Sequence, residues 1–134
     1  TETAEKYGYE QVKIWRRSYD VSPPRMDKNN DAHPSKDPQY SHIEPTLLPS
    51  SESLKDTLLR VMPFLNKRLI PDVKKGKNLM IVAHGNSLRA IVKFFKQISD
   101  YDIVSLNIPT GSPFVLEINK ELKVIDDYYL ENVK

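Results

Sequence analysis

The feature that most constrains the fold is an unbroken apolar run at residues 79–83 (LMIVA), which ends directly before His84. Successive side chains of a strand point to opposite faces, so this pattern is typical of a strand buried on both faces of a parallel sheet. Such a strand needs neighbouring strands on both sides. The run therefore predicts an α/β domain with a parallel sheet, most of whose strands lie outside this sequence.

An amphipathic helix is predicted directly after this run, because Leu88, Ile91, Val92 and Phe95 recur at the spacing of one helix face. The unit is therefore strand, turn and helix. Ligands of open α/β sheets bind beyond the carboxyl ends of the strands, which is where His84 would lie. Two interpretations of His84 stay open on this pattern: a reacting group, or a residue that only fills the turn.

The turn after His84 has the composition of an anion site. Gly85 permits close backbone approach, and Asn86 can cap the helix together with the serine that follows it. Free N–H groups and the dipole at a helix N-terminus favour a phosphate. A histidine beside such a turn indicates phosphoryl chemistry.

Two adjacent arginines, Arg16 and Arg17, form the second candidate site. Neighbouring helical residues project about 100° apart, so a solvated pair is the usual interpretation. A guanidinium group can nevertheless bind phosphate or carboxylate through two parallel hydrogen bonds. Arg89 is expected on the helix surface or in a salt bridge, and Glu52 is expected to interact with a helix dipole rather than to act as an acid or base.

The rest of the chain is predicted to contain helices, one irregular segment and a hairpin. Helices are expected over residues 1–20 and 53–69, the second with a Ser53 and Asp56 capping box and an end at Pro71 and Gly76. Six of the 10 prolines fall in residues 21–50, which predicts a long loop, either a functional lid or surface padding. A short helix is expected from Ser99 and Asp102 through Leu106, and the segments PFVLEIN and LKVIDDYYL predict two strands joined at Asn119 and Lys120.

Composition excludes several classes of function. The net charge of +2 comes without an arginine-rich stripe, so no nucleic-acid partner is expected. No apolar run reaches the ~20 residues of a membrane span, and the absence of cysteine excludes disulfides, so a cytoplasmic protein is the default. His33 and His42 lack the spacing of zinc ligands, and no metal site is expected.

Five segments, in order along the chain, resemble the C-terminal half of 2,3-bisphosphoglycerate-dependent phosphoglycerate mutases: ETAEKYG, QVKIWRRSYD, ESLKDT, AHGNSLR and LNIPTGSPFV. The segment AHGNSLR alone would indicate only the broader histidine phosphatase superfamily. The resemblance implies an α/β domain with a doubly wound, mostly parallel sheet. It implies an enzyme in which a phosphorylated histidine exchanges its phosphoryl group with phosphoglycerates, primed by 2,3-bisphosphoglycerate. It also implies a homodimer or tetramer.

The resemblance implies roles for five residues of this chain. His84 matches the second active-site histidine, which donates a hydrogen bond to the transferring phosphoryl group. Gly85 and Asn86 match phosphate-binding positions, and Arg16 and Arg17 match the paired arginines that bind the anionic groups of the substrate.

The departures from the family pattern bear on activity. The family carries its nucleophilic histidine in an Arg-His-Gly motif, which does not occur in this sequence, and its glutamate general acid precedes the position of Thr1. A family lysine falls before the same position, the loop at residues 26–50 diverges, and the longer tail of many members is missing.

Residues 1–134 are therefore expected to be the C-terminal part of a single phosphoglycerate mutase-like domain, with an incomplete sheet and no mutase activity alone. The alternatives are a histidine phosphatase and a non-catalytic phosphate-binding module.

Overall fold

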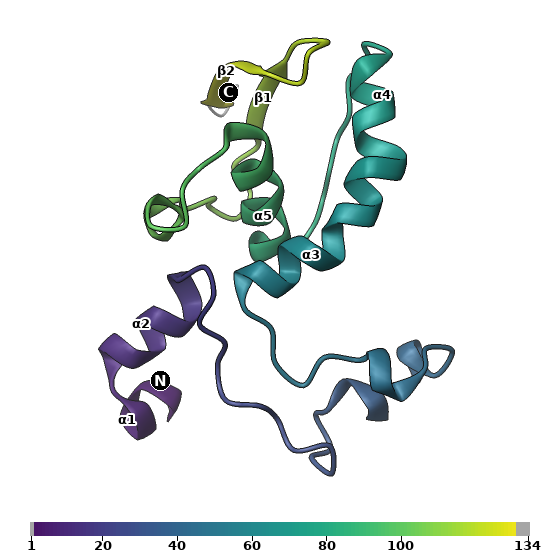
Figure 1. The fold of residues 1–134 in the computed structure, drawn as a ribbon. Coiled ribbons are helices and arrows are strands. Elements are labelled where there is room, and N and C mark those ends of the chain that lie inside the picture. Colours follow the sequence, from purple (N-terminus) through teal and green to yellow (C-terminus); the bar gives the residue numbers. More distant parts are fainter. Residues whose placement is uncertain (1, 131–134) are drawn as a thin grey trace.

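The computed structural model describes residues 2–130, in which a small C-terminal hairpin lies at one end of the molecule and the first helices lie at the other (Figure 1). The helices are α1 (Glu2–Tyr7), α2 (Tyr9–Arg17), α3 (Leu54–Phe64), α4 (Ile70–Lys74) and α5 (Gly85–Lys96). The strands are β1 (Phe114–Ile118) and β2 (Val124–Tyr129). The remaining elements are single turns η1 (Pro34–Lys36), η2 (Pro38–Tyr40), η3 (Pro45–Leu47) and η5 (Asp102–Ser105), and the π-helix η4 (Leu65–Leu69).

The helix predicted over residues 1–20 is two helices. Gly8 interrupts it with a φ of 84°, a left-handed conformation that does not continue an α-helix. The rings of Tyr7 and Trp15 meet edge to face at 5.1 Å and hold α1 against α2. The second helix ends at Arg17, three residues earlier than predicted.

The capping box that begins α3 is confirmed. The Ser53 Oγ accepts the Asp56 N–H at 3.2 Å, and the Asp56 carboxylate accepts the Ser53 N–H at 2.9 Å. The expectation that Pro71 ends this helix is wrong, because the wider π-helix η4 leads directly into α4. A proline ring clashes with the carbonyl four residues earlier in an α-helix, and the wide turn before Pro71 relieves that clash. The helical stretch stops before Gly76, at φ 73°.

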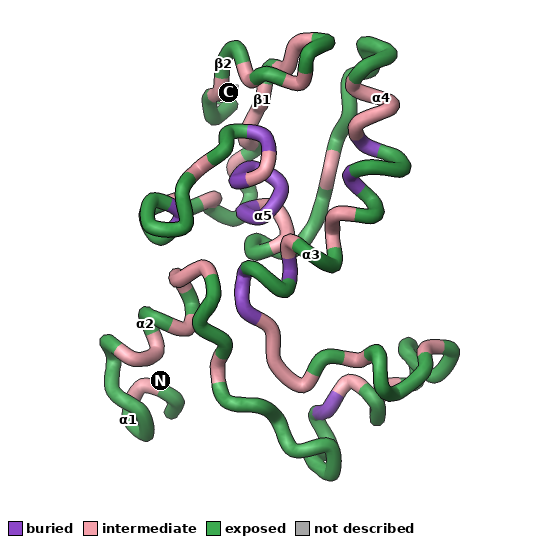
Figure 2. The backbone as a smooth tube through the Cα atoms, in the orientation of Figure 1, coloured by how far each residue is buried: buried purple, intermediate pink, exposed green. Residues whose placement is uncertain are grey.

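Helix α5 contributes more buried residues to the core than any other described element, as the gathering of buried residues on it shows (Figure 2). Its Ile91 and Phe95 pack with Leu65 and Leu69 of η4, and apolar residues of the hairpin cover this cluster. On a neighbouring face, Ala90 packs with the buried residues Leu54 and Ile103. The amphipathic pattern predicted for this helix is therefore confirmed, with Leu88 only half-buried.

The C-terminal hairpin is confirmed as an antiparallel pair, with Phe114 opposite Tyr129. Its turn is longer than predicted and runs from Asn119 to Lys123. The Asn119 side-chain oxygen accepts N–H groups from both Glu121 and Lys123, at 3.1 and 2.9 Å. The short helix after Ser99 is present as η5, and the Ser99 Oγ accepts the Asp102 N–H at 3.0 Å.

The prediction of a buried strand at residues 79–83 is wrong for the part of the chain that the structure describes. Residues 78–83 form an extended segment with no backbone-to-backbone hydrogen bond within residues 2–130. Met80 and Val82 are 89% and 83% exposed, while Ile81 packs against the core. The physical reason is that a strand forms only where another strand accepts its hydrogen bonds. The one sheet among the described residues has two strands, so the predicted doubly wound parallel sheet is not formed here.

The segment at residues 21–50 is irregular, as predicted, and each of its three short 3₁₀ turns begins with a proline. His33 is 1% exposed and lies between the hydroxyls of Ser35 and Ser50, at 2.8 and 3.1 Å. It has a structural role in this loop. Within residues 2–130, no helix is both long and apolar enough to cross a bilayer.

Candidate active site

His84 forms the N-cap of α5. Its backbone is extended, and its Nδ1 accepts the Asn86 N–H at 3.3 Å. Because Nδ1 acts as an acceptor, the proton of the neutral ring sits on Nε2. The side chain is exposed at the end of the segment 78–83. Helix capping by His84 therefore leaves Nε2–H as a donor for a ligand.

The first turn of α5 suits an anion. Gly85 and Asn86 are both exposed, and no acidic residue occurs in this turn to compete with a bound anion. A Cβ placed on Gly85 would meet no atom within 4 Å apart from its chain neighbours and the backbone of its own helix, so the space beside it is open to a ligand. The N–H groups and the dipole of this 12-residue helix favour a negative charge at that point.

The arginine pair lies at the C-terminal end of α2, with Arg16 exposed and Arg17 half-buried. The Arg17 Nη2 donates to the Asn107 Oδ1 at 3.2 Å. The backbone of Asn107 is held in turn, because its carbonyl accepts the Tyr129 hydroxyl at 2.7 Å. No sequence motif predicts a role for Asn107 at the site. Its position within LNIPTGSPFV, one of the segments that resemble the family, is the one feature of the sequence that points to it.

Arg89 corrects a sequence-based expectation, because it is buried rather than at the surface, with only 4% of it exposed. A guanidinium group has five N–H donors, and each finds an acceptor here. The acceptors are the carbonyl oxygens of Arg16, Arg17, Ile103 and Leu106 and the side-chain oxygen of Asn86, at 2.8 to 3.3 Å. Arg89 thereby joins the end of α2 to the first turn of α5.

The charge of Arg89 is balanced by dipoles, since none of its five acceptors is a carboxylate. Burial lowers its pKa from the ordinary value, and the neighbouring Arg17 charge lowers it further. The last carbonyls of α2 lack partners within their own helix and lie at its negative dipole end. Arg89 satisfies two of them, which makes this buried cation acceptable.

Other candidates lie outside this arrangement. Glu52 forms a two-point ion pair with Arg60, at 2.7 and 3.0 Å, and so is engaged at the start of α3. Among the described residues, no group of three histidine or acidic side chains could hold a metal ion.

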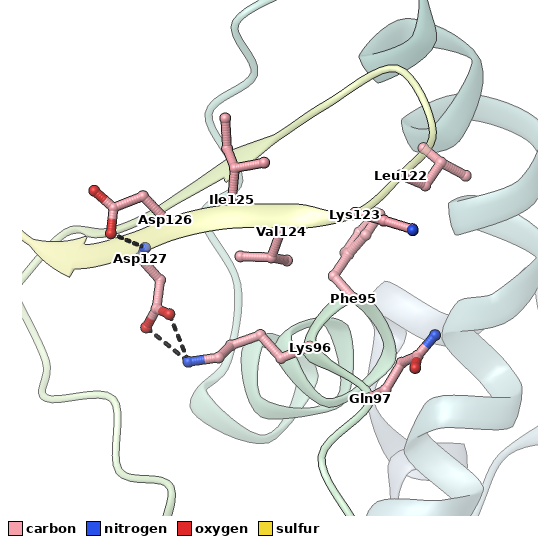
Figure 3. A pocket seen from close by; sticks show the side chains of 9 residues that line it. All are labelled: Phe95, Lys96, Gln97, Leu122, Lys123, Val124, Ile125, Asp126 and Asp127. Atoms are coloured by element: carbon pink, nitrogen blue, oxygen red, sulfur yellow. Dashed lines mark hydrogen bonds and ion pairs between the residues drawn. The ribbon is translucent and has the colours of Figure 1, made fainter.

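A surface pocket of about 450 Å³ lies at the far end of α5 from His84, between Phe95 and the hairpin (Figure 3). There Lys96 pairs with Asp127 at 2.7 Å. This pocket is therefore separate from the candidate site.

Comparison with known proteins identifies the family of this chain. The model of the histidine phosphatase superfamily (branch 1) matches residues 1–130. Proteins named 2,3-bisphosphoglycerate-dependent phosphoglycerate mutase from Borreliella burgdorferi (strain ZS7) and Treponema denticola are each 52% identical, over 130 and 129 residues. A protein of the same name from Borreliella afzelii is 50% identical over 130 residues.

These alignments cover 97% of the chain for the two Borreliella proteins and 96% for the Treponema protein, but 52% of each relative. The chain therefore spans about half the length of the curated relatives it matches. The family model covers nearly all of the chain. The chain belongs to branch 1 of the histidine phosphatase superfamily.

Proposed function

We propose that the native protein interconverts 3-phosphoglycerate and 2-phosphoglycerate through a phosphorylated enzyme histidine. The names of the relatives support this reaction. The structural observation that carries it is the hydrogen bonding of Arg89, which joins the arginine pair of α2 to the helix N-terminus beside His84. Phosphoglycerates carry a phosphate and a carboxylate, and paired guanidinium groups with helix N–H donors suit both.

In this proposal His84 stabilises the phosphoryl group during transfer. Its Nε2–H donates to an equatorial oxygen, where negative charge accumulates in the transition state. Capping of α5 through Nδ1 fixes the ring so that this donor needs little reorganisation. Gly85 and Asn86 bind the same group, and Arg16 and Arg17 bind the remaining anionic groups of the substrate.

The cationic residues also suit 2,3-bisphosphoglycerate, which supplies the phosphoryl group that primes the enzyme when bound. Arg16 and Arg17 with the first turn of α5 would hold its anionic groups, since no acidic residue interrupts that turn. The proposed chemistry uses no metal ion. A glycolytic role would put the protein in the cytoplasm, and family resemblance favours a homodimer or tetramer.

We further propose that residues 1–134 form the C-terminal part of one domain. The nucleophilic histidine and the other strands of a doubly wound, mostly parallel sheet would then lie in residues outside this sequence. The unpaired backbone of residues 78–83 supports this proposal, because it is an extended segment without a strand neighbour in the described part of the chain. Residues 1–134 should then have no mutase activity alone, since phosphoryl transfer needs the nucleophilic histidine.

A histidine phosphatase would use the same pocket to transfer the phosphoryl group to water, and a phosphate-binding module would only bind it. The deciding assay compares isomerisation stimulated by 2,3-bisphosphoglycerate with release of inorganic phosphate from 3-phosphoglycerate, in the full-length native protein. Faster isomerisation supports the mutase. Faster phosphate release identifies a phosphatase, and binding without turnover identifies the module. Turnover by residues 1–134 alone would contradict the domain proposal.

His84→Ala in the full-length protein tests the assigned role of this histidine. Loss of one charge-stabilising donor lowers kcat by roughly 10²- to 10³-fold in comparable enzymes. We expect a fall of that order, with a much smaller change in KM, measured by steady-state and single-turnover kinetics. An unchanged chemical rate would refute the role of His84.

A further inference from the structure

We propose that Arg89 is a positioning residue that fixes both halves of the phosphate site: the arginine pair at the end of α2 and the Asn86 amide in the first turn of α5. The inference rests on the proposed function for its substrate, but its anion-binding part can be tested separately. Arg89 acts through these residues and is not assigned a contact with substrate.

The first part of the argument concerns α2. The Arg89 Nη1 and Nη2 donate to the carbonyls of Arg16 and Arg17, at 3.3 and 3.0 Å. These contacts cross 73 and 72 residues of sequence and connect to the backbone of the two residues whose side chains form the cationic pair. The direction in which α2 presents its arginines is therefore tied to α5.

The second part concerns Asn86. Its Oδ1 accepts from the Arg89 Nη1 at 3.2 Å. Because a guanidinium group can only donate, this contact fixes which end of the amide faces Arg89. The two donors of the Asn86 NH₂ group therefore remain for another partner. Donors are what a phosphate needs, so Arg89 sets the amide in the orientation useful for an anion.

The third part concerns the chemical identity of residue 89. Nε and Nη2 also bind the Leu106 and Ile103 carbonyls, at 3.1 and 2.8 Å, so the planar group spans three segments at once. A lysine keeps the charge but has only three donors on a single nitrogen. It cannot reproduce five contacts. Arg89→Lys therefore separates positioning from charge.

Helix α5 offers a matched control in Lys93, which is 7% exposed. Its Nζ binds the Ile98 carbonyl and the Asp100 carboxylate, at 2.6 and 2.7 Å, and lies over the Tyr19 ring. None of these contacts reaches Arg16, Arg17 or Asn86. Lys93→Met therefore removes a buried cation of the same helix without removing the proposed positioning contacts.

The experiment uses the full-length native protein, Arg89→Lys and Lys93→Met. It measures kcat and KM for 3-phosphoglycerate, the Kd of inorganic phosphate by calorimetry, and the thermal midpoint. We expect Arg89→Lys to lower kcat/KM at least tenfold, mainly through KM, and to weaken phosphate binding at least fivefold. Lys93→Met should keep kcat/KM and the phosphate Kd within twofold of the wild type, even if its thermal midpoint falls as much as that of Arg89→Lys.

The inference is overturned if folded Arg89→Lys stays within twofold of the wild type in both values, or if Lys93→Met loses as much as Arg89→Lys. A wild-type protein without isomerase activity would refute the proposed function instead. In that case the calorimetric comparison still tests Arg89.

A measurement on the wild type covers the case in which Arg89→Lys does not fold. In ¹⁵N NMR spectra, the guanidinium N–H signals of Arg89 should be resolved and should exchange with water at least tenfold more slowly than those of the exposed Arg68. Adding inorganic phosphate should shift the Arg89 and Asn86 side-chain signals and leave the Lys93 signal in place. Exchange as fast as that of Arg68, or no shift of Asn86, would overturn the inference.

Discussion

The hairpin β1–β2 and the extended segment at residues 78–83 differ in where their hydrogen-bond partners lie. In the hairpin, Val115 of β1 pairs with Tyr128 of β2. A short turn joins the two strands, so each strand has its hydrogen-bond partner close by in the sequence. The segment 78–83 has no backbone partner within residues 2–130, although its sequence is the more apolar of the two. An apolar run thus makes a segment suitable for a strand, but the strand forms only where a second strand accepts its backbone hydrogen bonds.

The side chains of segment 78–83 differ in how far they are buried. Ile81 packs on the cluster formed by η4 and α5, and hairpin residues such as Leu116 pack on the same cluster. Met80 and Val82 remain exposed. Within residues 78–83, Ile81 is therefore the one residue that is partly covered, while the other side chains and the backbone are not. Such an edge favours pairing with another strand.

Hydrogen exchange gives the largest expected difference between the two regions. In residues 1–134 alone, amides 79–83 should exchange nearly as fast as an unfolded peptide, and amides of β1 and β2 should be protected. In the full-length protein, a completed sheet should slow the exchange of amides 79–83 by about 10³-fold, since core strands open only with sub-global unfolding. Equal rates for amides 79–83 in both proteins would contradict the proposal that strands outside this sequence pair with them.

Val82→Lys should give the next largest effect. In residues 1–134 alone the side chain is 83% exposed, so the free energy of unfolding should change by less than about 0.5 kcal/mol. In the full-length protein a strand buried on both faces would have to bury the charge, at a cost of roughly 2–3 kcal/mol or more. Urea denaturation measures both values. Ile125→Lys, at 66% exposure on β2, is the matched control. A small effect of Val82→Lys in the full-length protein would show that Val82 stays exposed.

Features with local signals could be predicted from the sequence. The capping box needs only Ser53 and Asp56, three residues apart, and the spacing of apolar residues in α5 is set by the helix itself. The hairpin strands also follow from short runs that are rich in β-branched and aromatic residues and lie close together in the sequence. The π-helix before Pro71 was not predicted, because a proline usually ends an α-helix. The helix continues past Pro71 here only because the preceding turn is wider than an α-helical turn.

Features that depend on distant partners could not be predicted. The burial of Arg89 depends on carbonyls of α2 and η5, so the sequence indicated only a surface or salt-bridged arginine. The exposure of residues 78–83 likewise depends on the absence of a strand partner within residues 2–130, which an apolar run does not reveal. The roles of His84 and of the arginine pair came from family resemblance, and local chemistry alone left them open.

Lys96→Met should weaken the attachment of the hairpin to α5 by a small amount. The Lys96 Nζ contacts both carboxylate oxygens of Asp127 at 2.7 Å, and both side chains are 30% exposed. Partly exposed pairs of this kind contribute about 0.5 kcal/mol, and salt screens them. Urea denaturation at low salt should detect the loss, and at 1 M salt the variant and the wild type should differ less. A difference that grows with salt would show that packing rather than charge connects the two elements.

Tyr128 gives the smallest expected effect and is specific to the hairpin. Partial desolvation, the 3.3 Å hydrogen bond to Glu117 and the nearby charges of Glu117 and Asp126 raise the pKa of its phenol from the ordinary 10.0. Above pH 10 the unfolded chain therefore loses this proton before the folded hairpin does, and the stability of the folded state falls as pH rises. Thermal unfolding between pH 8 and about 11 should show a shallower decline for Tyr128→Phe than for the wild type. Parallel pH profiles would show that the hydrogen bond to Glu117 does not raise the pKa of Tyr128, and that this contact does not stabilise the hairpin.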